Sequence, residues 1–157
     1  QNENDDTLVI KQQLVGLHSG EYEQDIPEAM KWFYMAASNH NDPDSQFFLG
    51  MCLHFSKVLG CEIPVKEYQL YRQKDGEEPD VDIVHDLDTL AFQWFQRAAD
   101  DGNHADAQYQ LGMWYISNAP EDDGERHKAM GKALRYLNLA KKQGHQAAIE
   151  TLNDINS

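Results

Sequence analysis

Apolar residues recur along this chain at the spacing of one face of an α-helix. In residues 91–99 they occupy positions i, i+3, i+4, i+7 and i+8, which share one face at 3.6 residues per turn. Residues 29–37 show the same pattern, and residues 133–141 show a looser version. Together with nearby caps, prolines and glycines, these patterns predict helices over residues 7–18, 27–39, 43–55, 87–100, 105–117, 126–143 and 146–153.

Two motifs recur at the same distance, which indicates an internal repeat. The Trp–Phe motif at Trp32 returns 62 residues later at Trp94, and the Leu–Gly–Met motif at Leu49 returns 62 residues later at Leu111. The Leu–Gly segments predict the first helix of a pair and the Trp–Phe segments the second. Each helix alone would leave an apolar face in water, so the pairs are expected to stack on one another.

The register of the repeat assigns roles to its tryptophans and glycines. Both Trp–Phe motifs place their tryptophans in the core. The glycines of the Leu–Gly motifs are expected at close helix–helix contacts. Two further glycines follow second helices, where a residue in the left-handed conformation is favoured. The tryptophans are Trp32 and Trp94, the glycines at helix contacts are Gly50 and Gly112, and the glycines after second helices are Gly102 and Gly144.

The most complete repeat begins with alanines at 105 and 107, followed by Leu111, Gly112 and Tyr115. Its second helix carries Ala133, Tyr136 and Ala140, and a glycine follows at 144. This pattern resembles the Sel1-like repeat family, which is related to the tetratricopeptide repeats. The resemblance implies an all-α fold, a short right-handed α-solenoid of stacked antiparallel helix pairs. We expect one domain over residues 1–157, with about three repeats, a C-terminal capping helix and an atypical insertion at 56–85.

The same resemblance implies a scaffold or adaptor that binds proteins, often in bacterial envelopes, with first helices lining a concave face. If Leu49 and Leu111 point into the stack, two equivalent rows of residues line that face. An acid, an aromatic residue and a methionine recur in them, which suits adaptable protein recognition. The rows are Asp44, Phe47, Met51 and His54, and Asp106, Tyr109, Met113 and Ile116. The alternative is that this face packs against the insertion or the next helix.

The insertion combines an apolar half with an acidic half. We expect the apolar half to pack against the core and the acidic half to stay hydrated. A loop of this length in a compact domain is usually functional or disordered. Tyr68 and Tyr71 are candidates for an added binding surface, and a merely decorative loop is the alternative. Cys52 and Cys61 are close enough for a local disulfide, while free thiols remain the other interpretation.

Charge narrows the class of partner. The formal net charge of −14 repels nucleic acid and anionic lipid surfaces, so we expect no nucleic-acid partner and favour a basic protein. No apolar run is long enough for membrane insertion. The chain begins at Gln1, which favours removal of a preceding segment, for example a secretory signal. We therefore expect a periplasmic or secreted bacterial protein, with a cytoplasmic location as the alternative.

Catalytic and metal-binding motifs have little support. No phosphate-binding loop, nucleophile elbow or H-E-x-x-H helix occurs. The acidic residues at 80–88 lack the glycine and glutamate spacing of a calcium loop, and Cys52, His54, Cys61 and His85 lack zinc-site spacing. We expect no metal, no cofactor and no enzymatic activity.

The leading hypothesis is thus a protein-binding module that uses the concave face and the insertion. A narrower form is an immunity protein that inhibits a secreted toxin. The alternatives are an envelope scaffold or assembly adaptor, a self-assembly module, and a metal-binding or enzymatic protein with the insertion as a lid over His54 and His85.

Overall fold

The computed structural model describes residues 26–56, 60, 62–70 and 84–157. This part of the chain contains six α-helices, one short 3-10 helix and no strand, which confirms the all-α prediction. The elements are α2 (Ile26–Asn39), α3 (Pro43–His54), η1 (Val65–Tyr68), α4 (Leu87–Asp100), α5 (Ala105–Ser117), α6 (Asp123–Lys142) and α7 (Gln146–Asn156). The predicted helix at 7–18 lies outside the described residues.

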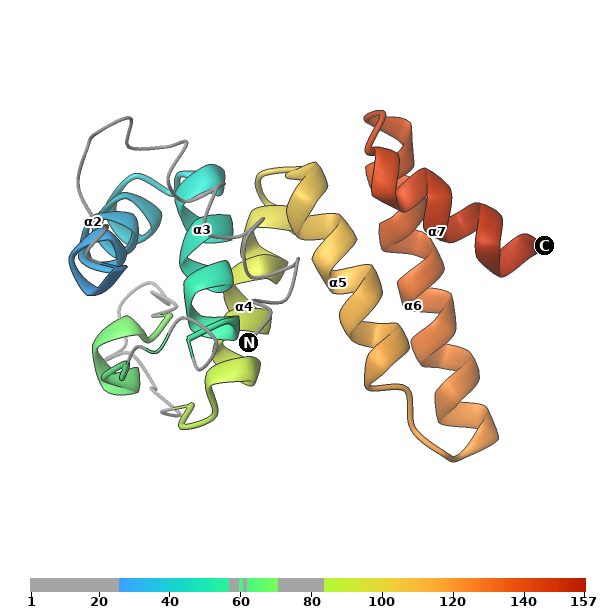
Figure 1. Ribbon diagram of the computed structural model, residues 1–157, viewed down its shortest axis with the longest axis horizontal. Coiled ribbons are helices and arrows are strands. Elements are labelled where there is room, and N and C mark those ends of the chain that lie inside the picture. Colours follow the sequence, from blue (N-terminus) through green and yellow to red (C-terminus); the bar gives the residue numbers. More distant parts are fainter. Residues whose placement is uncertain (1–25, 57–59, 61, 71–83) are drawn as a thin grey trace, which may run out of the picture.

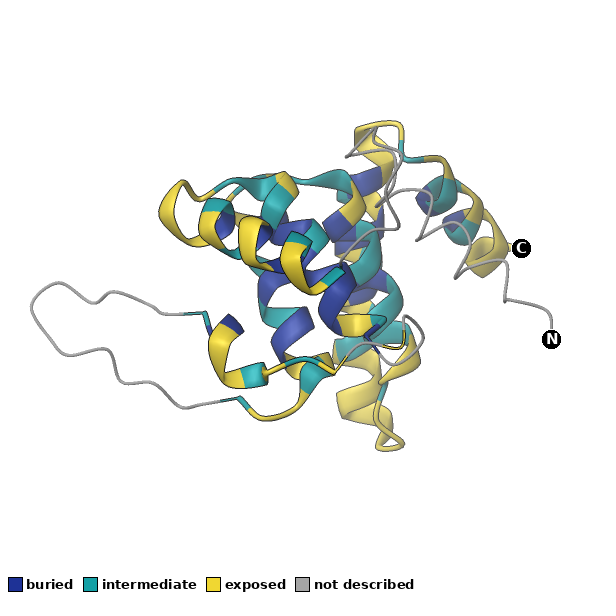
Figure 2. Cartoon of the chain, turned by 60° about the vertical axis from the view of Figure 1, so that its left-hand side comes forward, coloured by how far each residue is buried: buried dark blue, intermediate teal, exposed yellow. Residues whose placement is uncertain are grey.

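The helices stack in chain order, so that each packs mainly against the one before it and the one after it. Figure 1 shows this succession from α2 at one end of the molecule to α7 at the other. The α3–α4 and α5–α6 contacts are the most extensive, as expected for the two helices of one repeat. The result is a short solenoid of helix pairs. Figure 2 shows buried residues concentrated on the sides that these helices turn toward one another.

Predicted helix boundaries agree best where cap residues are clear. α4 and α5 have the predicted bounds, and Asp86 caps α4 by accepting a hydrogen bond of 2.9 Å from the backbone N–H of Thr89. α6 begins at Asp123, earlier than predicted, because Asp122 accepts an equivalent bond of 2.9 Å from Glu125. Residues 123–125, which precede the predicted helix at 126–143, are therefore helical.

The glycines of the Leu–Gly motifs lie at close helix contacts, as predicted. A Cβ atom on Gly50 would lie 2.7 Å from the Phe95 ring, and one on Gly112 would lie 2.7 Å from Leu137. The leucines beside them, Leu49 and Leu111, are fully buried. Each glycine thus allows the second helix of the pair to approach the first directly.

The turn after α4 differs from the prediction. Asn103, with φ of 50°, occupies the left-handed region there, and Asn41 does the same after α2. Gly102 serves another purpose, because a Cβ at that position would lie 2.4 Å from the Pro43 side chain at the start of α3. The prediction holds for Gly144 after α6, whose φ is +81°.

The two tryptophans assigned to the core have different environments. Trp94 is buried, and its indole N–H donates to the backbone carbonyl of Tyr68 at 3.0 Å. Trp32 is 61% exposed, so its assignment to the core was wrong. The buried face of α2 runs through Met30, Phe33 and Ala37, and a residue next to Phe33 in sequence points about 100° away from that face.

The apolar half of the insertion packs onto the core, as expected. Tyr68 is buried, and Ile63, Val65 and Leu70 pack against the main core cluster. Gln69 donates to the carbonyls of Val65 and Val84 and accepts from the Val84 backbone N–H, each at 2.9 Å. This buried amide ties the two described ends of the insertion together. Its acidic half lies outside the described residues.

None of the helices in the described part of the chain combines the length and apolar character needed to cross a bilayer.

Candidate protein-binding surface

Two rows were predicted to line a concave face, and the row on α3 is not a free surface. Phe47 is 4% exposed and Met51 is 5% exposed, so the expectation that they face solvent was wrong. The Phe47 ring stacks on His104, with centroids 4.8 Å apart, and contacts Phe95 at 5.9 Å. The alternative, packing of this face against following elements, accounts for these residues. α3 has apolar residues on every side over residues 47–53 and buries most of them, which is the pattern of a helix enclosed by its neighbours.

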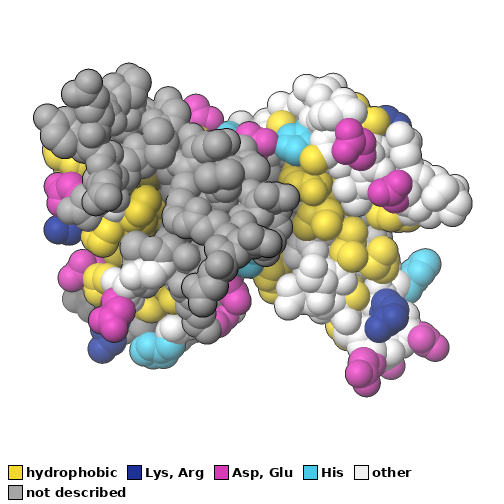
Figure 3. Space-filling view, viewed as in Figure 1, with side chains coloured by type: hydrophobic (Ala, Val, Ile, Leu, Met, Phe, Trp, Pro, Cys, Tyr) yellow, Lys and Arg dark blue, Asp and Glu magenta, His cyan; other side chains and the backbone are white. Residues whose placement is uncertain are grey.

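The predicted row on α5 lies nearer the surface. Tyr109, Met113 and Ile116 are all half-buried. Tyr109 and Ile116 pack against a second core cluster formed by α6 and α7, whereas Met113 lines a small pocket toward α3 and α4. Figure 3 shows hydrophobic side chains gathered over α5 and the neighbouring part of α6. The strip of α5 formed by the half-buried Tyr109, Met113 and Ile116 is called the α5 surface below.

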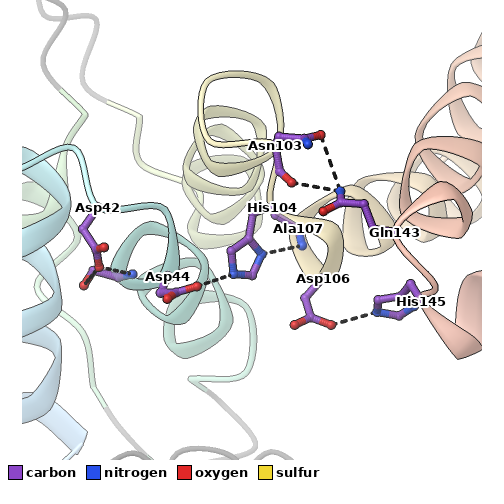
Figure 4. A network of polar contacts seen from close by, with 9 residues as sticks. Asp42, Asp44, Asn103, His104, Asp106, Ala107, Gln143 and His145 are labelled. Carbon is purple, nitrogen blue, oxygen red and sulfur yellow. Dashed lines mark hydrogen bonds and ion pairs between the residues drawn. The ribbon is translucent and has the colours of Figure 1, made fainter.

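The acidic members of the row hold successive repeats together. His104 precedes α5, and its Nδ1 accepts a hydrogen bond of 3.2 Å from the backbone N–H of Ala107. Its Nε2 lies 2.8 Å from a carboxylate oxygen of Asp44 on α3. Because Nδ1 is an acceptor, the neutral ring carries its proton on Nε2 and donates it to Asp44. Figure 4 shows this chain of contacts from α3 to α5.

The next repeat has the same arrangement. His145 accepts from the backbone N–H of Ala148 at 3.2 Å and lies 2.8 Å from Asp106. Its ring stacks on Tyr109 with a centroid distance of 4.8 Å, as His104 stacks on Phe47. We call each set an Asp–His joint. The sequence did not predict these contacts, because the two aspartate–histidine separations differ, at 60 and 39 residues.

Amides reinforce the second joint. The Asn103 side chain accepts from Gln108 at 2.8 Å, and the Gln143 amide donates to the Asn103 carbonyl and to Gln108, both at 2.9 Å. Asn41 accepts from Gln46 at 2.8 Å in the corresponding turn and from Arg97 at 3.0 Å. These contacts fix the left-handed turns and the angle between repeats, and so they set the relative positions of α3 and α5.

A pocket of about 110 Å³ opens where α3, α4 and α5 meet. Its floor is aromatic, because Phe92 and Trp114 lie 4.3 Å apart between ring centroids. At its edge, the Nδ1 atom of His54 lies 3.0 Å from a carboxylate oxygen of the exposed Asp88. The lining residues are His54, Asp88, Phe92, Phe95, Gln110, Met113, Trp114, Ser117 and Asn118. Two residues of the predicted row, His54 and Met113, meet here.

Asp88, Phe92 and Trp114, which line the pocket, were not among the residues predicted to contact a partner. The aromatic group continues away from the pocket, where Tyr115 meets Trp114 edge-on at 5.4 Å and stacks on Tyr136 at 6.1 Å. Burial, followed by the nearby charge of Asp100, raises the pKa of Tyr115.

The remaining candidates lie elsewhere. Tyr68, a candidate for an added binding surface on the insertion, is only 3% exposed and packs edge-on against Tyr34 at 5.6 Å, so it offers a partner almost no surface. Tyr71 lies outside the described residues. Cys52 is fully buried on α3, while Cys61 lies outside the described residues, so their disulfide stays a prediction. Within the described ranges, no cluster of three or more His, Cys, Asp or Glu residues could hold a metal ion.

Comparison with known families gives one match. A family model described as the Sel1 repeat matches residues 13–41, 43–62, 79–103 and 105–145, more than half of the chain. The unmatched residues 63–78 fall within the insertion predicted at 56–85. No curated protein and no solved structure matches the chain. Sel1 repeats generally mediate protein–protein interaction, and proteins built from them are typically non-enzymatic interaction modules.

Proposed function

Because the chain belongs to the Sel1 repeat family, we propose that it is a non-enzymatic module that binds a basic protein partner through the α5 surface. The observation that carries this proposal is the position of Met113. This flexible apolar side chain remains at the surface, whereas its repeat equivalent Met51 is buried. Methionine adapts readily to irregular partner surfaces.

Charge supports a basic partner. Asp44 and Asp106 flank the α5 surface, and their side chains are 74% and 58% exposed although each contacts a histidine. Asp88 lies at the edge of the adjoining pocket and is 62% exposed. With the net charge of −14, these carboxylates favour approach of a positive surface. The narrower hypotheses, toxin inhibition by an immunity protein and a periplasmic or secreted location in a bacterium, belong to this proposal.

A capture experiment tests the proposal. The tagged full chain and its Met113→Lys variant would be exposed to lysate and envelope extracts, and bound proteins identified by mass spectrometry. We expect a basic protein that binds the parent chain and is lost with Met113→Lys, because the added charge repels the partner and disrupts an apolar contact.

Met35→Lys is the matched control. Met35 is 51% exposed on the distant helix α2, so this variant adds the same charge without touching the α5 surface. Capture that survives Met113→Lys, or that both variants reduce equally, would contradict the proposed surface.

A further inference from the structure

We propose that the pocket between α3, α4 and α5 binds one arginine side chain of a protein partner. This inference rests on the proposed function and names the chemical group by which the partner is recognised. The pocket volume of about 110 Å³ is well below the roughly 300–1,000 Å³ of sites for drug-sized ligands. The pocket is therefore too small for a drug-sized ligand and of a size that suits a single side chain.

The electrostatics of the pocket favour a cation. α3 ends at His54 and α5 ends at Ser117, and both residues line the pocket. Two helix C-termini, the negative ends of their dipoles, are thus close to one hollow. Neither helix has Lys or Arg in its last turn, and the basic residue at the end of α3, His54, already contacts Asp88. α4 starts nearby, but its positive end is offset by the capping Asp86 and by Asp88.

The lining distinguishes arginine from lysine. Phe92 and Trp114 pack against each other and give the pocket an aromatic lining. A planar guanidinium packs on aromatic rings better than a compact ammonium does. Asp88 can accept hydrogen bonds from the guanidinium edge while it keeps its contact with His54. The side-chain carbonyls of Gln110 and Asn118 are further acceptors in the lining.

The test uses short capped peptides and needs no natural partner. The full ¹⁵N-labelled chain would be titrated with acetyl-Gly-Arg-Gly-amide and followed by NMR at its three tryptophan indole signals. We expect a saturable shift of the Trp114 signal, with those of Trp32 and Trp94 unchanged. The matching lysine peptide should bind at least about threefold more weakly, and the neutral citrulline peptide should bind more weakly still.

Asp88→Asn should weaken arginine-peptide binding by about threefold or more. Asp154→Asn removes the same charge from an exposed position on α7 and should leave binding unchanged. The proposal is overturned if Trp114 does not respond, if the lysine or citrulline peptide binds as tightly, or if the two Asp variants have equal effects. If the peptide titration fails but capture still depends on Met113, only the arginine pocket is wrong. If the peptide titration succeeds but capture is insensitive to Met113→Lys, only the proposed function of the α5 surface is wrong.

Discussion

At the scale of single residues, the glycines at close helix contacts leave the least room for a side chain. Gly50 lies under the buried Phe95 ring, where a Cβ would be 2.7 Å from the nearest ring carbon. Such a contact is shorter than van der Waals distance, and the ring cannot move away easily because Phe95 is only 4% exposed. By contrast, Gly131 in α6 is exposed, and nothing lies within 4 Å of its hypothetical Cβ. The two glycines therefore separate packing from helix propensity.

We predict that Gly50→Ala lowers the free energy of unfolding by about 1–3 kcal/mol, because overpacking outweighs the gain in helix propensity. Gly131→Ala should raise it by about 0.5–1 kcal/mol, since only the propensity term remains. Urea unfolding followed by circular dichroism measures both. Equal effects of the two substitutions would show that Gly50 has no special packing role.

Tyr136 links stability to alkaline pH. Its hydroxyl donates to Asp100 at 2.9 Å; burial, followed by this hydrogen bond, raises the pKa of Tyr136 to about 12. The folded state therefore favours the neutral phenol relative to the unfolded chain, whose pKa is about 10. The resulting stabilisation is fully present below pH 10 and is lost as the pH rises from about 10 to 12.

We expect the parent chain to lose about 2–3 kcal/mol of stability through this group over that pH range. Tyr136→Phe should flatten, but not abolish, the pH dependence, because burial also raises the pKa of Tyr68 and Tyr115. Denaturant titrations at several pH values compare the two chains. Parallel pH profiles would contradict this role for Tyr136.

At the scale of elements, the Asp–His joints decide how one repeat follows another. Each histidine caps a first helix, contacts a carboxylate on the preceding first helix and stacks on an aromatic ring there. The contact between imidazole and carboxylate contributes little, because the side chains of Asp44 and Asp106 are mostly exposed to water. The cap and the stacked ring are therefore expected to supply most of the stabilisation.

We predict that His104→Ala costs about 1–2 kcal/mol of unfolding free energy through loss of the cap and the stacked ring. His104→Asn should recover part of that loss, since asparagine is a favourable N-cap. His40→Ala provides the control, because His40 is exposed in the preceding inter-helix turn, and a change within about 0.5 kcal/mol is expected. If His104→Asn is no more stable than His104→Ala, the cap is not the main contribution.

Periodicity and caps predict α4 and α5 correctly because both signals are local to those segments. The apolar run at 47–53 leaves α3 no polar face and indicates burial of Phe47 and Met51, but the elements that cover them come from distant parts of the chain. The exposure of Trp32 likewise reflects the rotation of α2 against its neighbour, which the sequence repeat does not specify. The pocket joins His54 to Trp114 and could not be located before the helices were stacked.

At the scale of the whole molecule, stacking in chain order makes α5 a bridge. One side of α5 meets α4 and the other meets α6 and α7, while the strip around Met113 stays accessible. Insertion residues 62–70 pack down and tie to Val84 without contributing an exposed Tyr68. The proposed partner therefore meets a preformed α5 surface and the pocket beside it, under the field of an acidic chain.

The most direct test is methyl NMR of the methionine-labelled chain with the captured basic partner. The five methionines include Met113 on the α5 surface, exposed Met35 on α2 and buried Met51 on α3. We predict that the Met113 methyl signal shifts or broadens on saturation with the partner, while the Met35 signal is unchanged. A complex in which Met35 responds and Met113 does not would contradict binding through the α5 surface.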